Sequence, residues 1–209
     1  FIELSPFYKE VNGIITESQG FTSQNQYDGF VGSSTAKGLE FLANKRINAS
    51  NVWFSYTYGN QNYLFEEISI DKFPSNFDIT HTLNLATSIS LMENWKLGSG
   101  IQFRTGRPYT IPIEGQETYQ DGNFRRVNYG DLNIERLPNY MRLDASTSYE
   151  FKLGNTQEIL ISLGILNVLN KNNTLLRYYE VSSENSDEAI QIEKLSLALT
   201  PNFSVRYKF

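Results

Sequence analysis

The feature that most constrains the fold of this chain is a strict alternation of apolar and polar residues. Between residues 141 and 152, Leu143 and Phe151 alternate with charged residues such as Arg142 and Asp144. Successive side chains of a β-strand point to opposite faces, so this pattern predicts a strand with one apolar and one charged face. Five other stretches alternate in the same way, and two weaker runs bring the predicted number of strands to eight. The predicted strands are residues 1–9, 35–46, 50–58, 78–91, 95–104, 141–152, 159–165 and 201–209.

The connections between these strands alternate in length. Short connections are predicted at residues 47–49, 92–94 and 153–157, and long polar ones at residues 12–34, 66–76, 109–139 and 167–200. This order predicts an up-and-down meander with all its long loops at one end. Outer-membrane barrels have short periplasmic turns and longer external loops, whereas soluble sandwiches usually have short loops at both ends. We therefore expect an all-β fold, an antiparallel up-and-down transmembrane β-barrel.

The charged face of the predicted strand at 141–152 indicates that the interior of the barrel is hydrated. Arg142, Asp144, Glu150 and Lys152 share one face of one predicted strand, and burying all four in a dry core would carry a heavy desolvation cost. A water-filled lumen would solvate them while the opposite face met lipid. Alternation alone is also compatible with a soluble barrel whose apolar face points inward.

Composition excludes several other classes of protein. The chain has 209 residues, a net charge of −5, no cysteine and one histidine. The acidic balance argues against nucleic acid as a partner, and the lack of cysteine excludes disulfides and thiolate metal sites. A mean hydropathy of −0.40 and the lack of an apolar run of about 18 residues exclude a membrane-spanning helix. We find no catalytic constellation and no motif for a metal or cofactor, and His81 is predicted to be a structural residue on the apolar face.

Seven short segments resemble the carboxy-terminal barrel of TonB-dependent outer-membrane receptors, in the same order and with similar spacing. They are GLEF at 38–41, WFSYTY at 53–58, FDITH at 77–81, FRTGRPY at 103–109, LPNYMRLD at 137–144, ILNVLN at 165–170 and FSVRYKF at 203–209. Barrels of that family have 22 strands, so the resemblance implies that these eight are the last eight.

The resemblance also implies a function and a location. It implies TonB-dependent active uptake of a scarce, bulky ligand of siderophore, peptide or glycan type, captured by extracellular loops in the outer membrane of a Gram-negative bacterium. Residues 1–209 would form barrel wall, with a periplasmic carboxy terminus, and the plug domain and TonB box would be missing from this chain. Lipid, the TonB complex (through the plug) and the barrel-insertion machinery would be its partners. The insertion signal would consist of Phe203, Val205, Tyr207 and Phe209.

Candidate ligand-binding residues lie where strands meet the long loops. Arg104 and Arg107 flank a glycine before the loop at 109–139, and they are expected either to bind an anionic ligand or to pair with lumen carboxylates such as Asp144 and Glu150. The loops supply further candidates, because loops on rigid scaffolds often hold binding residues. These are Tyr109, Tyr119, Phe124, Arg125, Arg126, Arg177 and Tyr178.

The last long loop has a predicted structure of its own. Residues 175–181 and 190–199 are expected to form a hairpin with an acidic tip at 182–188, which lacks the spacing of a calcium-binding loop. Two alternatives to the receptor remain open. One is a self-contained eight-stranded outer-membrane barrel with a structural or adhesive role, and the other is a soluble ligand-binding barrel of lipocalin type. The chain begins without a signal-peptide pattern, which we interpret as a mature or processed piece of a longer protein.

Overall fold

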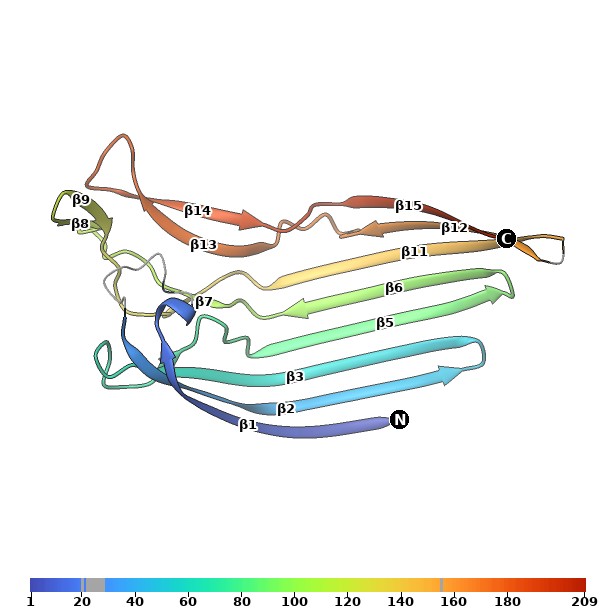
Figure 1. Cartoon of the computed structure of the whole chain (residues 1–209), viewed down its shortest axis with the longest axis horizontal. Coiled ribbons are helices and arrows are strands. Elements are labelled where there is room, and N and C mark those ends of the chain that lie inside the picture. Colours follow the sequence, from blue (N-terminus) through green and yellow to red (C-terminus); the bar gives the residue numbers. More distant parts are fainter. Residues whose placement is uncertain (20, 22–28, 155) are drawn as a thin grey trace.

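The computed structural model describes residues 1–19, 21, 29–154 and 156–209, which form an all-β structure with one short 3-10 turn. Eight strands follow one another through a single antiparallel sheet, as predicted (Figure 1). They are β1 (Ile2–Ile15), β2 (Val31–Ile47), β3 (Ser50–Leu64), β5 (His81–Met92), β6 (Trp95–Arg104), β11 (Tyr140–Leu153), β12 (Gln157–Leu166) and β15 (Thr200–Lys208). The short strand β4 (Phe73–Pro74) pairs with the end of β3. No helix among the described residues is long and apolar enough to cross a membrane.

The strand register separates apolar from polar side chains over the central strands β5, β6 and β11. Leu85 lies opposite Ile101, which in turn lies opposite Leu143. In the adjacent row, Gln102 lies opposite Arg142. We call the face that carries Leu85 and Leu143 the apolar face and the face that carries Gln102 and Arg142 the polar face. The alternation predicted from the sequence is therefore confirmed for these three strands, whereas β3 also places an apolar residue, Trp53, on the polar face in the row of Asp144.

The sheet is an open wall. β1 and β15 form its two edges and do not pair with each other, so the eight strands do not close into a barrel on their own. The accessible surface is 13327 Å², whereas a compact monomer of this mass would expose about 9,900 Å². The structure therefore does not support the self-contained eight-stranded barrel, nor the closed cup of a lipocalin.

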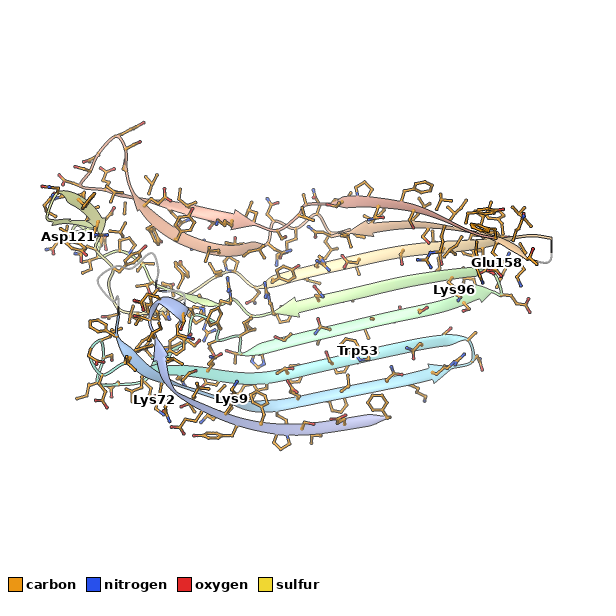
Figure 2. All side chains as sticks on the ribbon, in the orientation of Figure 1. Lys9, Trp53, Lys72, Lys96, Asp121 and Glu158 are labelled. Atoms are coloured by element: carbon orange, nitrogen blue, oxygen red, sulfur yellow. The ribbon has the colours of Figure 1, made fainter. Side chains whose placement is uncertain are left out.

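The long connections gather at one end of the sheet and the short turns at the other (Figure 1). Figure 2 shows the same polarity, with Lys96 and Glu158 at the turn end and Asp121 at the loop end. The predicted connections 12–34 and 153–157 lie partly outside the described residues. The described part of the first contains the 3-10 turn η1 (Glu17–Gln19).

The long loops hold more secondary structure than the sequence predicted. The predicted hairpin in the last loop is confirmed as β13 (Thr174–Val181) and β14 (Ala189–Leu195), with the second strand ending earlier than expected. The loop before β11 was predicted only as a long polar connection, and it contains the hairpin β8 (Thr118–Asp121) and β9 (Phe124–Val127). It also contains the short pair β7 (Pro108–Tyr109) and β10 (Glu135–Arg136).

Several strand boundaries differ from the prediction, among them the end of β1 at Ile15 instead of residue 9, and two of these differences have an identifiable reason. β3 continues beyond residue 58 to Leu64, because backbone pairing with β2 persists to Ser33 through a polar run that does not alternate. The strand predicted to begin at residue 78 begins at His81, because Asp78 is drawn out of the ladder into contacts with Gln61 and Arg136.

The buried core lies at the loop end. Phe21, Phe65, Phe73 and Leu132 pack together with Tyr63, the last inward-facing residue of β3 on the polar face. Among the described residues, every buried apolar side chain lies there or in the adjoining loops. They are Phe21, Tyr63, Phe65, Phe73, Tyr129, Leu132 and Leu137. The core therefore fixes the loops to the sheet and leaves both faces of the wall itself uncovered.

Candidate functional site

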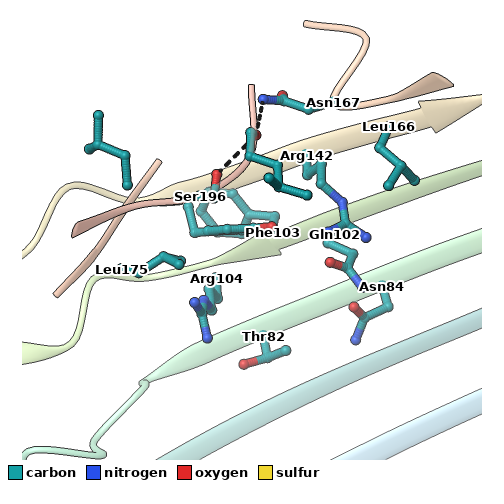
Figure 3. Close-up of a pocket in the computed structure, with 13 residues that line it drawn as sticks. Thr82, Asn84, Gln102, Phe103, Arg104, Arg142, Leu166, Asn167, Leu175 and Ser196 are labelled. Atoms are coloured by element: carbon teal, nitrogen blue, oxygen red, sulfur yellow. Dashed lines mark hydrogen bonds between the residues drawn. The ribbon is translucent and has the colours of Figure 1, made fainter. Parts of the chain in front are cut away.

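The first candidate site is a pocket of about 550 Å³ at the loop end of the polar face, which we call the wall pocket (Figure 3). Asn84, Gln102 and Arg142 project into it from adjacent strands, and Leu175 and Leu197 from the last loop lie above them. Its complete lining is Thr82, Asn84, Gln102, Phe103, Arg104, Tyr140, Arg142, Leu166, Asn167, Leu175, Leu195, Ser196 and Leu197. The strand pairing places amide and guanidinium groups side by side, because Asn84, Gln102 and Arg142 occupy one row of the ladder.

The arginines at this end do not make the ion pairs expected from the sequence. Asp144 pairs with Arg142 at 2.9 Å. The Arg104 guanidinium lies 4.7 Å from the centre of the Tyr140 ring, and Arg107 donates a hydrogen bond to the carbonyl of Leu175. Pairing of Arg104 or Arg107 with Asp144 or Glu150 is therefore not observed, since the nearer Arg142 already occupies Asp144.

The second candidate site is a cleft of about 380 Å³ between β7 and the β13–β14 hairpin, which we call the loop cleft. Its complete lining is Asn76, Phe77, Arg107, Pro108, Tyr109, Thr110, Tyr129, Asn133, Leu137, Leu176, Arg177, Tyr178 and Lys194. Figure 1 shows this hairpin extending beyond the ends of β12 and β15, on the side of the sheet where the long connections gather.

Arg177 is the most constrained cation of the loop cleft. Its Nε donates to Glu193 Oε1 at 2.9 Å, and its Nη1 donates to the Tyr109 hydroxyl at 2.5 Å. The guanidinium also lies 4.8 Å from the centre of the Tyr109 ring. Burial opposes the charged form of Arg177, but the hydrogen bonds with Glu193 and Tyr109 outweigh it and raise the Arg177 pKa. This side chain is thus fixed and permanently charged.

The predicted site residues fall into two groups. The structure brings Arg104, Arg107, Tyr109, Arg177 and Tyr178 to the two sites. The other predicted residues (Tyr119, Phe124, Arg125 and Arg126) lie in the β8–β9 hairpin and line neither site.

The two arginines of the β8–β9 hairpin are used in ion pairs. Arg125 pairs with Asp187 in the acidic tip of the last loop, and Arg126 pairs with Asp121. Thr118 Oγ1 donates to the carbonyl of Ser186 at 2.7 Å. These contacts join the β8–β9 hairpin to the acidic tip of the last loop, so the acidic segment serves a loop–loop contact.

Sequence reasoning missed several residues that line the sites. Asn84 and Gln102 could have been found, because they occupy polar positions of alternating strands that end at long loops. Phe77, Asn133 and Lys194 carried no such signal, since only the folding of separate loops brings them to the cleft.

A buried carboxylate holds the loop end together. Asp78 is 1 % exposed, accepts a hydrogen bond from the Gln61 backbone N–H at 2.7 Å, and pairs with Arg136. Arg136 also donates through Nη1 to the carbonyl of Gly106 at 3.0 Å. The FDITH and FRTGRPY segments therefore meet through Arg136, which neither segment contains.

We expect Asp78→Ala to lower the free energy of unfolding by about 2 kcal/mol, because Gln61 and Arg136 would lose a charged acceptor at a buried position. Asp121→Ala is the matched control: it removes the partner of Arg126 in an exposed pair and should cost less than about 1 kcal/mol. Urea unfolding of both variants in lipid vesicles measures the difference. Equal losses would show that the Asp78 contacts do not stabilise the loop end.

The ILNVLN segment forms a turn that also has a structural role. Asn167 and Asn170 have φ values of 53° and 48°, which asparagine tolerates better than most residues. The Asn167 backbone N–H donates to Asp144 at 2.9 Å, and its side-chain amide donates to the carbonyls of Lys171 and Leu197. Asn167 thus ties the end of β12 to β11 and to the last loop.

The remaining predicted residues that belong to strands lie on the apolar face, and Phe209 follows the end of β15. Phe203, Val205 and Tyr207 face β12 through Leu163, Ile161 and Ile159, and all three are exposed. His81 Nδ1 lies 2.8 Å from the Tyr56 hydroxyl, and its ring packs beside Tyr56 and Tyr58. These contacts agree with a structural role for His81.

An open antiparallel wall with an exposed apolar face, an opposite polar face and long loops at one end is the architecture of part of an outer-membrane β-barrel. Residues 1–168 match the family described as "TonB dependent receptor-like, beta-barrel". The chain belongs to this family, which consists of receptors and transporters of the Gram-negative outer membrane. No curated protein and no solved structure matches the chain. The matched region ends before β13, β14 and β15, so the loop cleft combines residues from inside and outside it.

Proposed function

We propose that this chain supplies barrel wall and part of the ligand mouth of a receptor that imports a bulky ligand by TonB-dependent active transport. The observation that supports this most directly is the position of the wall pocket and the loop cleft. Both lie at the end of the sheet where the long connections gather, and the wall pocket opens on the polar face. A ligand held there would stand at the entrance of a hydrated lumen.

The proposal includes an orientation in the membrane. The apolar face contacts outer-membrane lipid, the long loops are extracellular, and the carboxy terminus is periplasmic. Aromatic residues support this arrangement, because barrels carry aromatic girdles at both membrane interfaces. Trp95, Tyr149 and Tyr207 occupy the apolar face near the turn end, and Tyr56 and Tyr58 occupy it near the loop end.

The proposal also covers the plug domain, the TonB box and the insertion signal. We propose that a plug domain and a TonB box belong to the same receptor outside these 209 residues, and that the plug connects the receptor to the TonB complex. Phe203, Val205, Tyr207 and Phe209 are recognised by the barrel-insertion machinery. Their exposed fractions of 64 %, 55 %, 51 % and 92 % leave this edge of the apolar face open to such a contact.

Cysteine labelling in cells tests the orientation, and these 209 residues contribute no cysteine of their own to the background. Ser183→Cys in the last loop should react with a membrane-impermeant maleimide in intact cells. Glu93→Cys in the β5–β6 turn should react only after the outer membrane is permeabilised. Labelling of Glu93→Cys but not Ser183→Cys in intact cells would overturn the orientation.

Uptake assays test the transport itself. Cells that carry the full-length receptor should accumulate one of four ligand types, namely ferric siderophores, corrinoids, glycans or peptides. Inactivation of TonB should abolish this accumulation. Uptake that persists without TonB, or no uptake of any of the four, would contradict the proposed function.

A further inference from the structure

We propose that the loop cleft binds an anionic group attached to a planar aromatic ring, which makes an aromatic anion the class of ligand recognised by this receptor. This inference rests on the proposed function and deepens it, because the same mouth would admit the imported molecule. It is carried by the charges, the rings and the size of the cleft.

The charge of the loop cleft is opposite to that of the chain. Three cations line it (Arg107, Arg177 and Lys194), and no aspartate or glutamate is among its lining residues, although the chain as a whole carries −5. Glu193 pairs with Arg177. Within the described parts of the chain, neither Arg107 nor Lys194 forms an ion pair. Two positive charges are therefore left for a ligand.

Arg107 is suited to receive such a charge. Its side chain is half-buried, and the carbonyl of Leu175 accepts a hydrogen bond from one of its five N–H donors. Burial and the nearby positive charge of Arg104 lower the pKa of Arg107. An arriving anion would relieve this repulsion and replace the water that Arg107 loses, and charge-assisted hydrogen bonds to guanidinium are among the strongest in proteins.

The rings of the cleft supply the second half of the recognition. Phe77, Tyr109 and Tyr178 line it, and the Phe77 side chain is 47 % exposed. Arg177 covers the Tyr109 ring, and the Lys194 ammonium lies 5.7 Å from the centre of the Tyr178 ring. Aromatic rings favour offset stacking or edge contacts with a second ring. A planar ligand would thus find both stacking surfaces and cations at one place.

The dimensions of the cleft agree with a ring rather than a whole large ligand. A volume of about 380 Å³ is at the small end of the range for ligand pockets. A substituted aromatic ring fits it, and the rest of a bulky molecule would extend toward the wall pocket. Arg104 and Arg142 line that pocket, and no carboxylate is among its lining residues.

Direct binding to the full-length receptor in detergent tests the inference, with naphthalene-2-sulfonate as the probe. Naphthalene-2-sulfonamide is the control compound that lacks the charge, and sulfate is the control compound that lacks the ring. In equilibrium dialysis, we expect each of these two control compounds to bind at least ten times more weakly than the probe. Equal binding of the sulfonamide would overturn the need for charge, and equal binding of sulfate would overturn the need for a ring.

Variants locate the binding to the loop cleft. Lys194→Gln changes an exposed side chain, so it should leave the fold intact, and it should lower the affinity for the probe about threefold. The double variant Arg107→Gln/Lys194→Gln should weaken it at least tenfold. Lys72→Gln, an exposed lysine beside Thr35, is the control and should have no effect. Unchanged affinity in Lys194→Gln and in the double variant would place the probe elsewhere and overturn the inference.

This experiment separates the two proposals. Binding in detergent does not require TonB, so probe binding at the loop cleft without TonB-dependent uptake would refute only the proposed function. TonB-dependent uptake with unchanged probe binding in the variants would refute only the ligand class.

Discussion

Replacement of Leu85 with arginine is expected to lower the free energy of unfolding by about 2–4 kcal/mol, which is the cost of an arginine near the midplane of a bilayer. Leu85 lies in the middle of β5, in the apolar row between Phe54 and Ile101. If this row contacts lipid, the guanidinium must enter hydrocarbon or deform the bilayer. Equilibrium unfolding of the receptor in lipid vesicles, followed by tryptophan fluorescence, measures the loss.

The neighbouring residue provides the control. Asn84 belongs to the polar face and lines the wall pocket, so Asn84→Arg would place the same charge in water and should cost less than about 1 kcal/mol. A loss near zero for Leu85→Arg, or a larger loss for Asn84→Arg, would put water on the apolar face. The proposed orientation of the wall would then be wrong.

Gly106→Ala is expected to cost about 3 kcal/mol or more, because the new methyl group has no room. A Cβ at this position would lie 1.6 Å from the carbonyl oxygen of Leu137. The contact is with backbone, so a side-chain rotation cannot relieve it. The loop that carries Arg136 and Leu137 must move away, which would also break the Arg136 hydrogen bond to the carbonyl of Gly106.

Gly100→Ala is the matched change for this test. Gly100 lies in the middle of β6, and the nearest atom to an added Cβ is the carbonyl oxygen of Leu85 at 3.9 Å, an ordinary contact. The midpoint of urea unfolding should fall strongly for Gly106→Ala and by little for Gly100→Ala. Equal midpoints would show that the loop adjusts without loss, and the close packing of Gly106 on Leu137 would then have no structural importance.

The wall could be predicted because its information is local. Each strand repeats the alternation of its own residues, as between Leu143 and Asp144, and pairing then joins rows of the same kind. The prediction failed where a polar run does not alternate, as at the end of β3, and where a residue left the pattern for a distant partner. The alternation predicts that Asp78 lies in a strand, but its carboxylate binds Gln61 and Arg136, and the strand begins three residues later.

The sites were less predictable, because they join segments that lie far apart in the sequence. Arg104 and Arg107 were candidates on account of their position before a long loop, and they do line the two sites. Their expected carboxylate partners were wrong, since sequence shows neither that Arg142 occupies Asp144 nor that Leu175 accepts a hydrogen bond from Arg107. Arg125 and Arg126 were candidates for the same reason, because they lie in a long loop. The structure uses them in ion pairs, Arg125 with the last loop and Arg126 within its own hairpin.

The sequence by itself determined the strands of the wall, their order and its two faces, because the two-residue period of each strand depends only on the residues of that strand. Only the tertiary structure decided that the sheet stays open, which charges remain without partners, and that Lys194 and Arg107, which are 87 positions apart, line the same cleft. Those features depend on where loops fold back in space, and a charge is left for a ligand only after its nearer partners have been satisfied.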